Sequence, residues 1–271
     1  MRTRNTFAYL TAVLVVGVTV VPILFVVAGG FRTTAQINAD PGGLPSPWVL
    51  DNYKFILSSP NFWRFLGNSA LIAVVATMLA VALGSMAAFA LSRYSFKGRD
   101  AVYGLFTIGL LFPLSAASLP LYLLLRQLGM LESPLGVAIP EAAFSLPVTI
   151  VILRPFMRAI PAEVEEAAVL DGASRLGFFW RILLPLSVPA LTTVAVLAFV
   201  TSWNAYLLPF LVFNDSEHFT LPLGVTAFQA QYTQDTARIF AFTALSMLPA
   251  LGFFVLAERR IVGGLTGSVK G

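Results

Sequence analysis

The stretch from Ala70 to Leu91 reads ALIAVVATMLAVALGSMAAFAL and contains no charged residue. A bilayer core about 30 Å thick is crossed by roughly 20 apolar residues in helical form. A strand of a membrane barrel would alternate apolar and polar residues, and this stretch shows no such alternation. We therefore predict a membrane-spanning helix here.

Five further segments have the same character. The six predicted spans are 7–27, 70–91, 102–125, 137–153, 186–213 and 239–256. The first follows Arg2 and Arg4 and resembles a signal peptide, but its apolar run exceeds the 7–15 residues usual for one, so we interpret it as an uncleaved helix. The predicted fold class is all-α, a polytopic membrane protein with one domain over 1–271.

Composition supports this class. Hydrophobic residues make up 58% of the 271 residues and charged residues only 11%, whereas soluble domains carry roughly 25% charge. An ordinary soluble domain and a disordered chain are both excluded. A disulfide-stapled module is excluded because the chain has no cysteine.

The basic residues predict the orientation, because cytoplasmic loops are enriched in Lys and Arg. With both termini inside, 12 of the 17 basic residues are cytoplasmic: Arg2, Arg4, Arg93, Lys97, Arg99, Arg154, Arg158, Arg175, Arg181, Arg259, Arg260 and Lys270. The other five are Arg32, Lys54, Arg64, Arg126 and Arg238. The net charge of +4 thus mostly reflects the basic residues that fix the orientation of the spans. No nucleic-acid partner is indicated.

Several kinds of chemistry are missing. The chain has no G-x-x-x-x-G-K-[ST] phosphate loop. The single histidine, His218, lies among loop residues and is interpreted as a surface residue. Glu141, near the outer end of the fourth span, is the only acidic residue that comes close to the inside of a span. We predict no catalytic residue, no metal site and no proton-driven carrier.

The inner loop over 156–185 is the most informative segment. Pro161 suits the first turn of a helix, and Glu163, Glu165 and Glu166 suit its positive end. Asp171-Gly172 predicts a helix stop with glycine in the left-handed conformation. A second short helix is predicted over 174–183. The loop is either a rigid helix–turn–helix that transmits force or a plain re-entry loop held by surface charges.

The same loop resembles the EAA motif of ABC importer permeases. The motif is Glu-Ala-Ala, three residues, Gly, nine residues, Ile-x-Leu-Pro; here it is Glu166-Ala167-Ala168, Gly172 and Ile182-Leu183-Leu184-Pro185. The segment 203–209, WNAYLLP, and the tail 260–271 resemble the carbohydrate branch typified by the maltose transporter. Ala205 departs from the acidic residue usual there, so no role is transferred to it.

The resemblance implies a type I importer permease fold, a multi-pass protein of the bacterial inner membrane, and a set of partners. They are a second homologous permease, two copies of a cytoplasmic ATPase that binds ATP and Mg²⁺, an extracytoplasmic sugar-binding protein, and membrane lipid. No cofactor is implied for this chain itself. The missing phosphate loop agrees with that division of labour.

The resemblance also implies residue roles. Glu166 would contact the rim of a groove in the ATPase, Ala167 and Ala168 would permit close docking, and Asp171-Gly172 would set the turn. Ile182, Leu184 and Pro185 would anchor the loop to the fifth span.

The translocation path is a separate expectation. Candidate residues are Ser115, Ser118, Trp203, Asn204 and Tyr206, because sugars suit aromatic faces with hydroxyl and amide groups. Interfacial or packing roles for Trp203 and Tyr206 remain an alternative. Permeases for a polyol, glycerol phosphate or peptide, or a self-sufficient channel or secondary carrier, are alternative functions.

Overall fold

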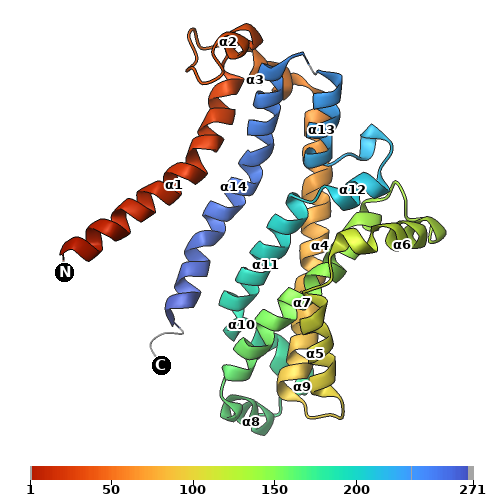
Figure 1. The fold of residues 1–271 in the computed structure, drawn as a ribbon. Helices are drawn as coiled ribbons and strands as arrows, with labels where there is room; N and C mark the ends of the chain where they lie inside the picture. Colours follow the sequence, from red (N-terminus) through yellow and green to blue (C-terminus); the bar gives the residue numbers. More distant parts are fainter. Residues whose placement is uncertain (1, 233, 268–271) are drawn as a thin grey trace. The chain divides into compact units, whose positions relative to one another are not determined.

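A computed structural model describes residues 2–232 and 234–267, with side chains at 9–232 and 234–254. The described part of the chain consists of helices and connections, with no β-strand in it (Figure 1). The side chains of the tail 260–271, which contributes to the family resemblance, lie outside the described residues.

Among the described residues, four helices are long and apolar enough to cross a membrane. They are Tyr9–Gly30 within α1 (Arg2–Gly30), α4 (Pro60–Arg93), α7 (Pro134–Ala159) and Thr236–Phe254 within α14 (Thr236–Gly267). Two bent pairs of helices raise the number of candidate spans to six if each pair is one span.

The segment expected as one helix over 102–125 is two helices. α5 (Arg99–Gly109) and α6 (Leu114–Gln127) meet at an angle of 101°. Pro113 stands between them as the N-cap of α6 in an extended conformation. Proline lacks a backbone N–H and disfavours helical geometry at the residue before it, so the helix ends before Pro113 and restarts in another direction.

The segment expected over 186–213 is also interrupted. Residues Arg175–Leu186 meet α11 (Val188–Trp203) at 79°, and a separate helix α12 (Leu207–Val212) follows. Pro209 explains the second break, because its ring would clash with the carbonyl group of Ala205 in a continuous helix. As the third residue of a new helix it meets no such carbonyl group.

The chain divides into two units, of which the first comprises 1–66 and 221–249. It contains α1, α2 (Thr34–Ala39), α3 (Asp51–Ser58), α13 (Leu221–Gln231) and parts of α4 and α14. Aromatic rings hold it together: Phe242 stacks on Phe228 at 4.9 Å and meets Phe62 edge-on at 5.7 Å. The Tyr53 hydroxyl donates to the carbonyl oxygen of Val27 at 2.8 Å, and burial raises the pKa of Tyr53 to about 12.

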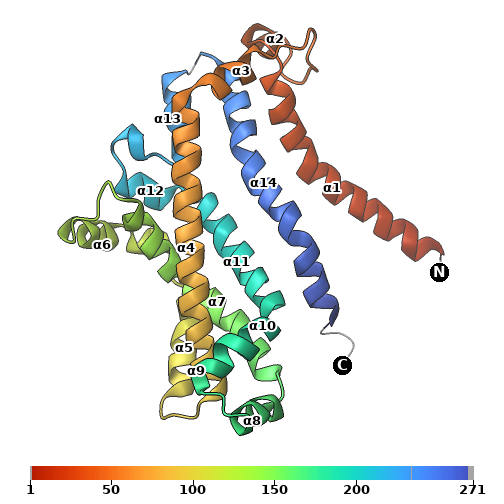
Figure 2. The ribbon, with the colours of Figure 1, turned by 180° about the vertical axis from the view of Figure 1, so that it is seen from behind.

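The second unit comprises 67–220 and 250–271. Its remaining elements are α8 (Ala162–Leu170), α9 (Arg175–Phe178), the π-helix η1 (Phe179–Leu183), α10 (Leu184–Leu186) and the 3₁₀ turn η2 (Ser216–His218). α7 packs against α5 and α11. Figures 1 and 2 show α8 beyond the end of α7 in both views.

Small residues bring the helices of the second unit close together. Ala80, Ala142 and Ala198, from α4, α7 and α11, form one buried cluster. A Cβ atom on Gly84 would lie 2.4 Å from the Cγ2 atom of Thr149. Close approach of this kind is how helices associate where lipid supplies no hydrophobic driving force.

Candidate functional site

The loop after α7 folds as a helix, a turn and a second helical segment. α8 starts after Pro161, whose φ of −55° suits a helix start, and carries Glu163 and Glu165 in its first turn. These acidic residues are stabilised by the positive end of the helix dipole. The second segment starts at Ser174, whose side chain accepts a hydrogen bond from the Gly177 N–H at 3.1 Å.

The turn between the two segments is a Schellman motif. Gly172 has a φ of +82°, a left-handed conformation that glycine adopts without steric cost. Its N–H donates to the Val169 carbonyl oxygen at 3.0 Å, and the Ala173 N–H donates to the Ala168 carbonyl oxygen at 2.9 Å. The stop that the sequence predicts at Asp171-Gly172 therefore has a defined hydrogen-bonded geometry.

Aromatic and aliphatic residues fix the loop to the bundle. Phe178 and Phe179 are buried, and the Phe179 ring lies 4.9 Å from that of Phe89 on α4. Ala168 is 5% exposed and belongs to the same core. Ile182 and Leu184 are half-buried against this core, whereas Pro185 is exposed at the start of α10.

Burial separates the EAA residues into two groups. Ala168 faces the interior of this chain, so its small size serves packing within the chain. Glu166, Ala167, Asp171 and Gly172 are exposed.

Three apolar side chains beside them are exposed as well, although the sequence did not single them out. They are Val169 at 55%, Leu170 at 88% and Leu176 at 63%. We call Glu166, Ala167, Val169, Leu170 and Leu176 the loop surface. The sequence could not identify these three residues, because periodicity alone does not show which face of a short helix is covered. Apolar residues outside the predicted spans were the one sequence feature that pointed to them.

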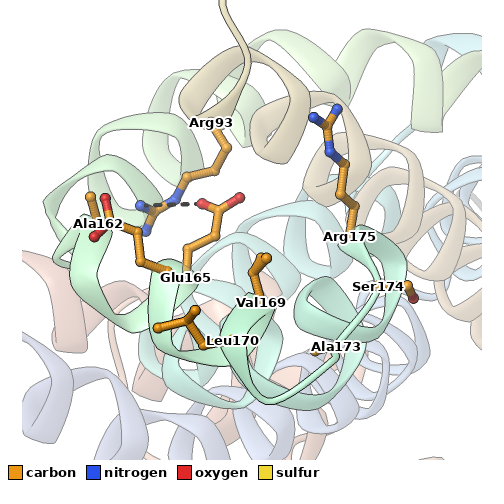
Figure 3. A pocket seen from close by; sticks show the side chains of 9 residues that line it. Arg93, Ala162, Glu165, Val169, Leu170, Ala173, Ser174 and Arg175 are labelled. Carbon is orange, nitrogen blue, oxygen red and sulfur yellow. Dashed lines mark ion pairs between the residues drawn. The ribbon is translucent and has the colours of Figure 1, made fainter.

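A pocket of about 770 Å³ opens beside α8. It is lined by Arg93, Ala162, Glu165, Glu166, Val169, Leu170, Ala173, Ser174 and Arg175. Figure 3 shows Arg93 and Glu165 pointing toward each other, with Arg175 on the other side of the pocket. The Arg93 Nη1 atom lies 3.7 Å from a carboxylate oxygen of Glu165.

The residues expected along the translocation path differ in exposure. Trp203 is 4% exposed and stacks on Phe199 with ring centroids 5.6 Å apart. Tyr206 is exposed and stacks on Phe210 at 5.6 Å. The exposed Asn204 amide donates to the Val200 carbonyl oxygen at 2.9 Å.

The two serines of this expectation lie in the first turns of α6. The Ser118 hydroxyl donates to the Ser115 carbonyl oxygen at 2.8 Å. α6 packs against α12, which follows Tyr206 directly. The serines and the 203–206 segment therefore belong to neighbouring elements, and no described side-chain contact joins them.

A buried polar pair was not expected from the sequence. The Ser202 hydroxyl donates to the Glu141 carboxyl oxygen Oε2, which links α11 to α7. Ser202 is 8% and Glu141 9% exposed, and the second carboxyl oxygen, Oε1, is buried without a partner. The sequence placed Glu141 near the outer end of the fourth span, but only the packing of α7 on α11 shows its partner.

His218 is half-buried, and its ring lies 5.9 Å from that of Phe213. Among the side chains described at 9–232 and 234–254, no group of three His, Cys, Asp or Glu residues could hold a metal ion.

Residues 80–261 match the model of a protein family described as "Binding-protein-dependent transport system inner membrane component". The chain belongs to this family. It is therefore an inner-membrane permease subunit and a transport component without enzymatic activity. The EAA motif read from 166–185 belongs to the family, as the sequence resemblance predicted.

Relatives of this permease agree. The diacetylchitobiose uptake system permease protein NgcG of Streptomyces coelicolor is 33% identical over 251 residues, covering 92% of this chain and 83% of that protein. The trehalose transport system permease protein SugB of Mycobacterium tuberculosis is 33% identical over 271 residues, covering 99% and 98%.

A solved bacterial ABC transporter that imports the acidic polysaccharide alginate has a chain of the same fold. That chain matches with a TM-score of 0.79 at 23% identity, covering 96% of this permease and 98% of the transporter chain. The likeness confirms the predicted importer permease fold.

Proposed function

We propose that this permease forms part of the translocation path for a sugar or oligosaccharide and couples to a separate ATPase through the loop around α8. The observation that carries the coupling role is the loop surface. Val169, Leu170 and Leu176 are exposed beyond the end of α7, on a loop pinned from behind by Phe178 and Phe179. An apolar surface outside the membrane needs a partner to cover it.

The proposed roles follow from the exposure of each residue. Ala167 offers no side chain beyond Cβ, so a partner backbone can approach there. Glu166 would make a polar contact at the edge. Gly172 holds α8 and α9 at a fixed angle, and Ala168, Ile182 and Leu184 tie the loop to the bundle.

The mechanism is a rigid-body switch. ATP binding closes the two ATPase subunits and displaces the docked loops, and the permease pair changes from inward-facing to outward-facing. The free energy comes from the different affinities of ATP and of the loaded binding protein for the two states.

We further propose six spans with both termini inside, with α5 and α6 together forming the third span and α11 lying in the fifth. The break at Pro113 then lies at membrane depth, where irregular backbone is tolerated only if protein or a water-filled cavity surrounds it. A bent span next to the path would supply such a cavity.

A sugar substrate is supported by the names of the relatives. Trp203, Asn204 and Tyr206 would provide stacking faces and hydrogen-bonding groups. A phosphorylated solute would favour Arg or Lys in the path, and the described parts of α4, α7 and α11 have neither in their central turns.

Reconstitution tests the proposal. The permease is placed in proteoliposomes with its partner permease, ATPase and binding protein, and sugar uptake and ATP hydrolysis are measured together. We expect uptake only with ATP and with all subunits. Solute flux through the chain alone would instead support a channel or secondary carrier.

Two loop variants test the coupling role in the same system. Ala167→Trp and Gly172→Asp should reach the membrane normally but lose sugar uptake per ATP hydrolysed. Normal transport in both variants would rule out coupling through this loop.

A further inference from the structure

Arg93, the last residue of α4, contacts both α7 and α8. Its Nη2 atom donates to the carbonyl oxygens of Met157 and Ile160, both at 2.9 Å. Its Nη1 atom lies 3.7 Å from the carboxylate of Glu165, and the Arg93 side chain is only 7% exposed. One guanidinium group therefore joins the end of α4 to the end of α7 and to the first turn of α8. Figure 3 shows its ion pair with Glu165.

The acceptors suit a cation. Met157 lies in the last turn of α7 and Ile160 is its C-cap, so these carbonyl groups lack helical partners and stand at the negative end of the helix dipole. The planar fork of arginine can meet several acceptors in fixed directions, which an ammonium group cannot do. A buried cation also requires such partners.

The link to Glu165 brings α8 into the same arrangement. Glu165 is 25% exposed and precedes the exposed residues Glu166 and Ala167 in sequence. Ala168 packs on the core through apolar contacts, which are not directional. The Arg93–Glu165 ion pair holds α8 by charge at 3.7 Å, and the two charge-assisted hydrogen bonds of Arg93 to α7 fix direction as well as distance. A displacement of α8 is thus passed to α4 and α7 most directly through Arg93.

We propose that Arg93 is a positioning residue that transmits displacement of the docked loop to α4 and α7. The inference rests on the proposed coupling function of the loop. A transmitting role for Arg93 differs from a purely structural role in one measurable respect. Loss of Arg93 lowers the sugar uptake per ATP hydrolysed in a transporter that still assembles.

The test uses the complete transporter in proteoliposomes, with sugar uptake and ATP hydrolysis measured on the same vesicles. In Arg93→Met we expect uptake per ATP to fall about tenfold. The lost hydrogen bonds involve a charged group, and the free energy of such a bond corresponds to roughly a tenfold change in an equilibrium constant. Arg158→Met is the matched control. Arg158 is an exposed arginine next to Met157 on α7, and its loss should leave the ratio unchanged. A wild-type ratio in Arg93→Met overturns the inference.

Arg93→Lys keeps the experiment decisive if Arg93→Met fails to assemble. Lysine retains the buried charge but not the fork, so uptake per ATP should fall about threefold, as expected for one lost hydrogen bond. A wild-type ratio in this variant, with Arg93→Met unassembled, contradicts the transmitting role. Glu165→Gln removes the ion pair that links Arg93 to α8 but keeps both carbonyl contacts of Arg93. Uptake per ATP should therefore fall in this variant too, and a wild-type ratio would contradict transmission through Arg93.

Ala167→Trp separates failure of this inference from failure of the proposed function. If both Ala167→Trp and Arg93→Met keep the wild-type ratio, the loop does not couple and the proposed function fails. If Ala167→Trp uncouples the transporter and Arg93→Met does not, only the inference about Arg93 fails.

Discussion

The backbone N–H of Ala173 donates to the carbonyl oxygen of Ala168 at 2.9 Å, which closes the turn between α8 and α9. The turn exists because Gly172, between them, has a φ of +82°. The buried Ala168 and the exposed loop surface are thereby held in one rigid piece.

Gly172→Ala should therefore weaken coupling without a steric clash. A Cβ atom at Gly172 would meet nothing within 4 Å, so the cost is conformational, about 1 kcal/mol for a left-handed residue with a side chain. We expect reduced sugar uptake per ATP and a small loss of thermal stability in detergent. Gly172→Asn is the control, because asparagine tolerates the left-handed conformation, and it should retain more uptake than the alanine variant. Equal uptake in both would contradict a conformational cause.

Leu170→Ser should weaken binding of the ATPase and leave folding unchanged. Leu170 is 88% exposed, so the isolated permease loses nothing, whereas a covered leucine contributes about 1.5–3 kcal/mol. We expect the ATPase affinity of the purified permease pair to fall about tenfold or more. Leu128→Ser, at a leucine that is 61% exposed after α6, is the matched control and should bind normally. Unchanged affinity in Leu170→Ser would place the docking surface elsewhere.

Ser202→Ala should destabilise the bundle. It removes the hydroxyl that donates to Glu141 and leaves a buried carboxyl group whose other oxygen already has no partner. The expected loss is about 1–3 kcal/mol of unfolding free energy, seen as a lower thermal midpoint in detergent.

Thr192→Ala is the control for this pair, because the Thr192 hydroxyl bonds only to the Val188 carbonyl oxygen one turn away at 2.8 Å. Such local bonds add little to stability. A similar midpoint in both variants would show that the Glu141–Ser202 pair is not a stabilising contact.

The proposed topology can be tested with single cysteines, because the chain has none of its own. Lys97→Cys should react with a membrane-impermeant maleimide only after lysis of spheroplasts, since the turn between α4 and α5 is expected inside. Ser216→Cys should react in intact spheroplasts. The reverse pattern would overturn the orientation derived from the basic residues.

Local signals in the sequence predicted the helix boundaries in the loop over 156–185 well. Pro161 and Gly172 act on the backbone beside them, so the start and stop of α8 could be read directly. Helix direction was harder, because hydropathy reports the length of an apolar run and not the direction of its axis. The segments 102–125 and 186–213 therefore looked continuous, although Pro113 and Pro209 contained the signal for the breaks before α6 and α12.

Contacts between distant residues could not be predicted at all. Arg93 looked like one more cytoplasmic charge, and its contacts with Met157, Ile160 and Glu165 depend on how α4 ends beside α7. The same holds for Ser202 and Glu141, which are far apart in sequence and meet only where α11 packs on α7.

The most direct test of coupling through the loop surface is a photo-cross-link from Leu170. A benzophenone amino acid replaces Leu170 in the purified, assembled transporter, and cross-linked peptides are identified by mass spectrometry. We predict a product that joins this residue to the ATPase subunit, with none from the same substitution at Leu128. Cross-links from position 170 to lipid or to the partner permease, and none to the ATPase, would contradict docking at this loop.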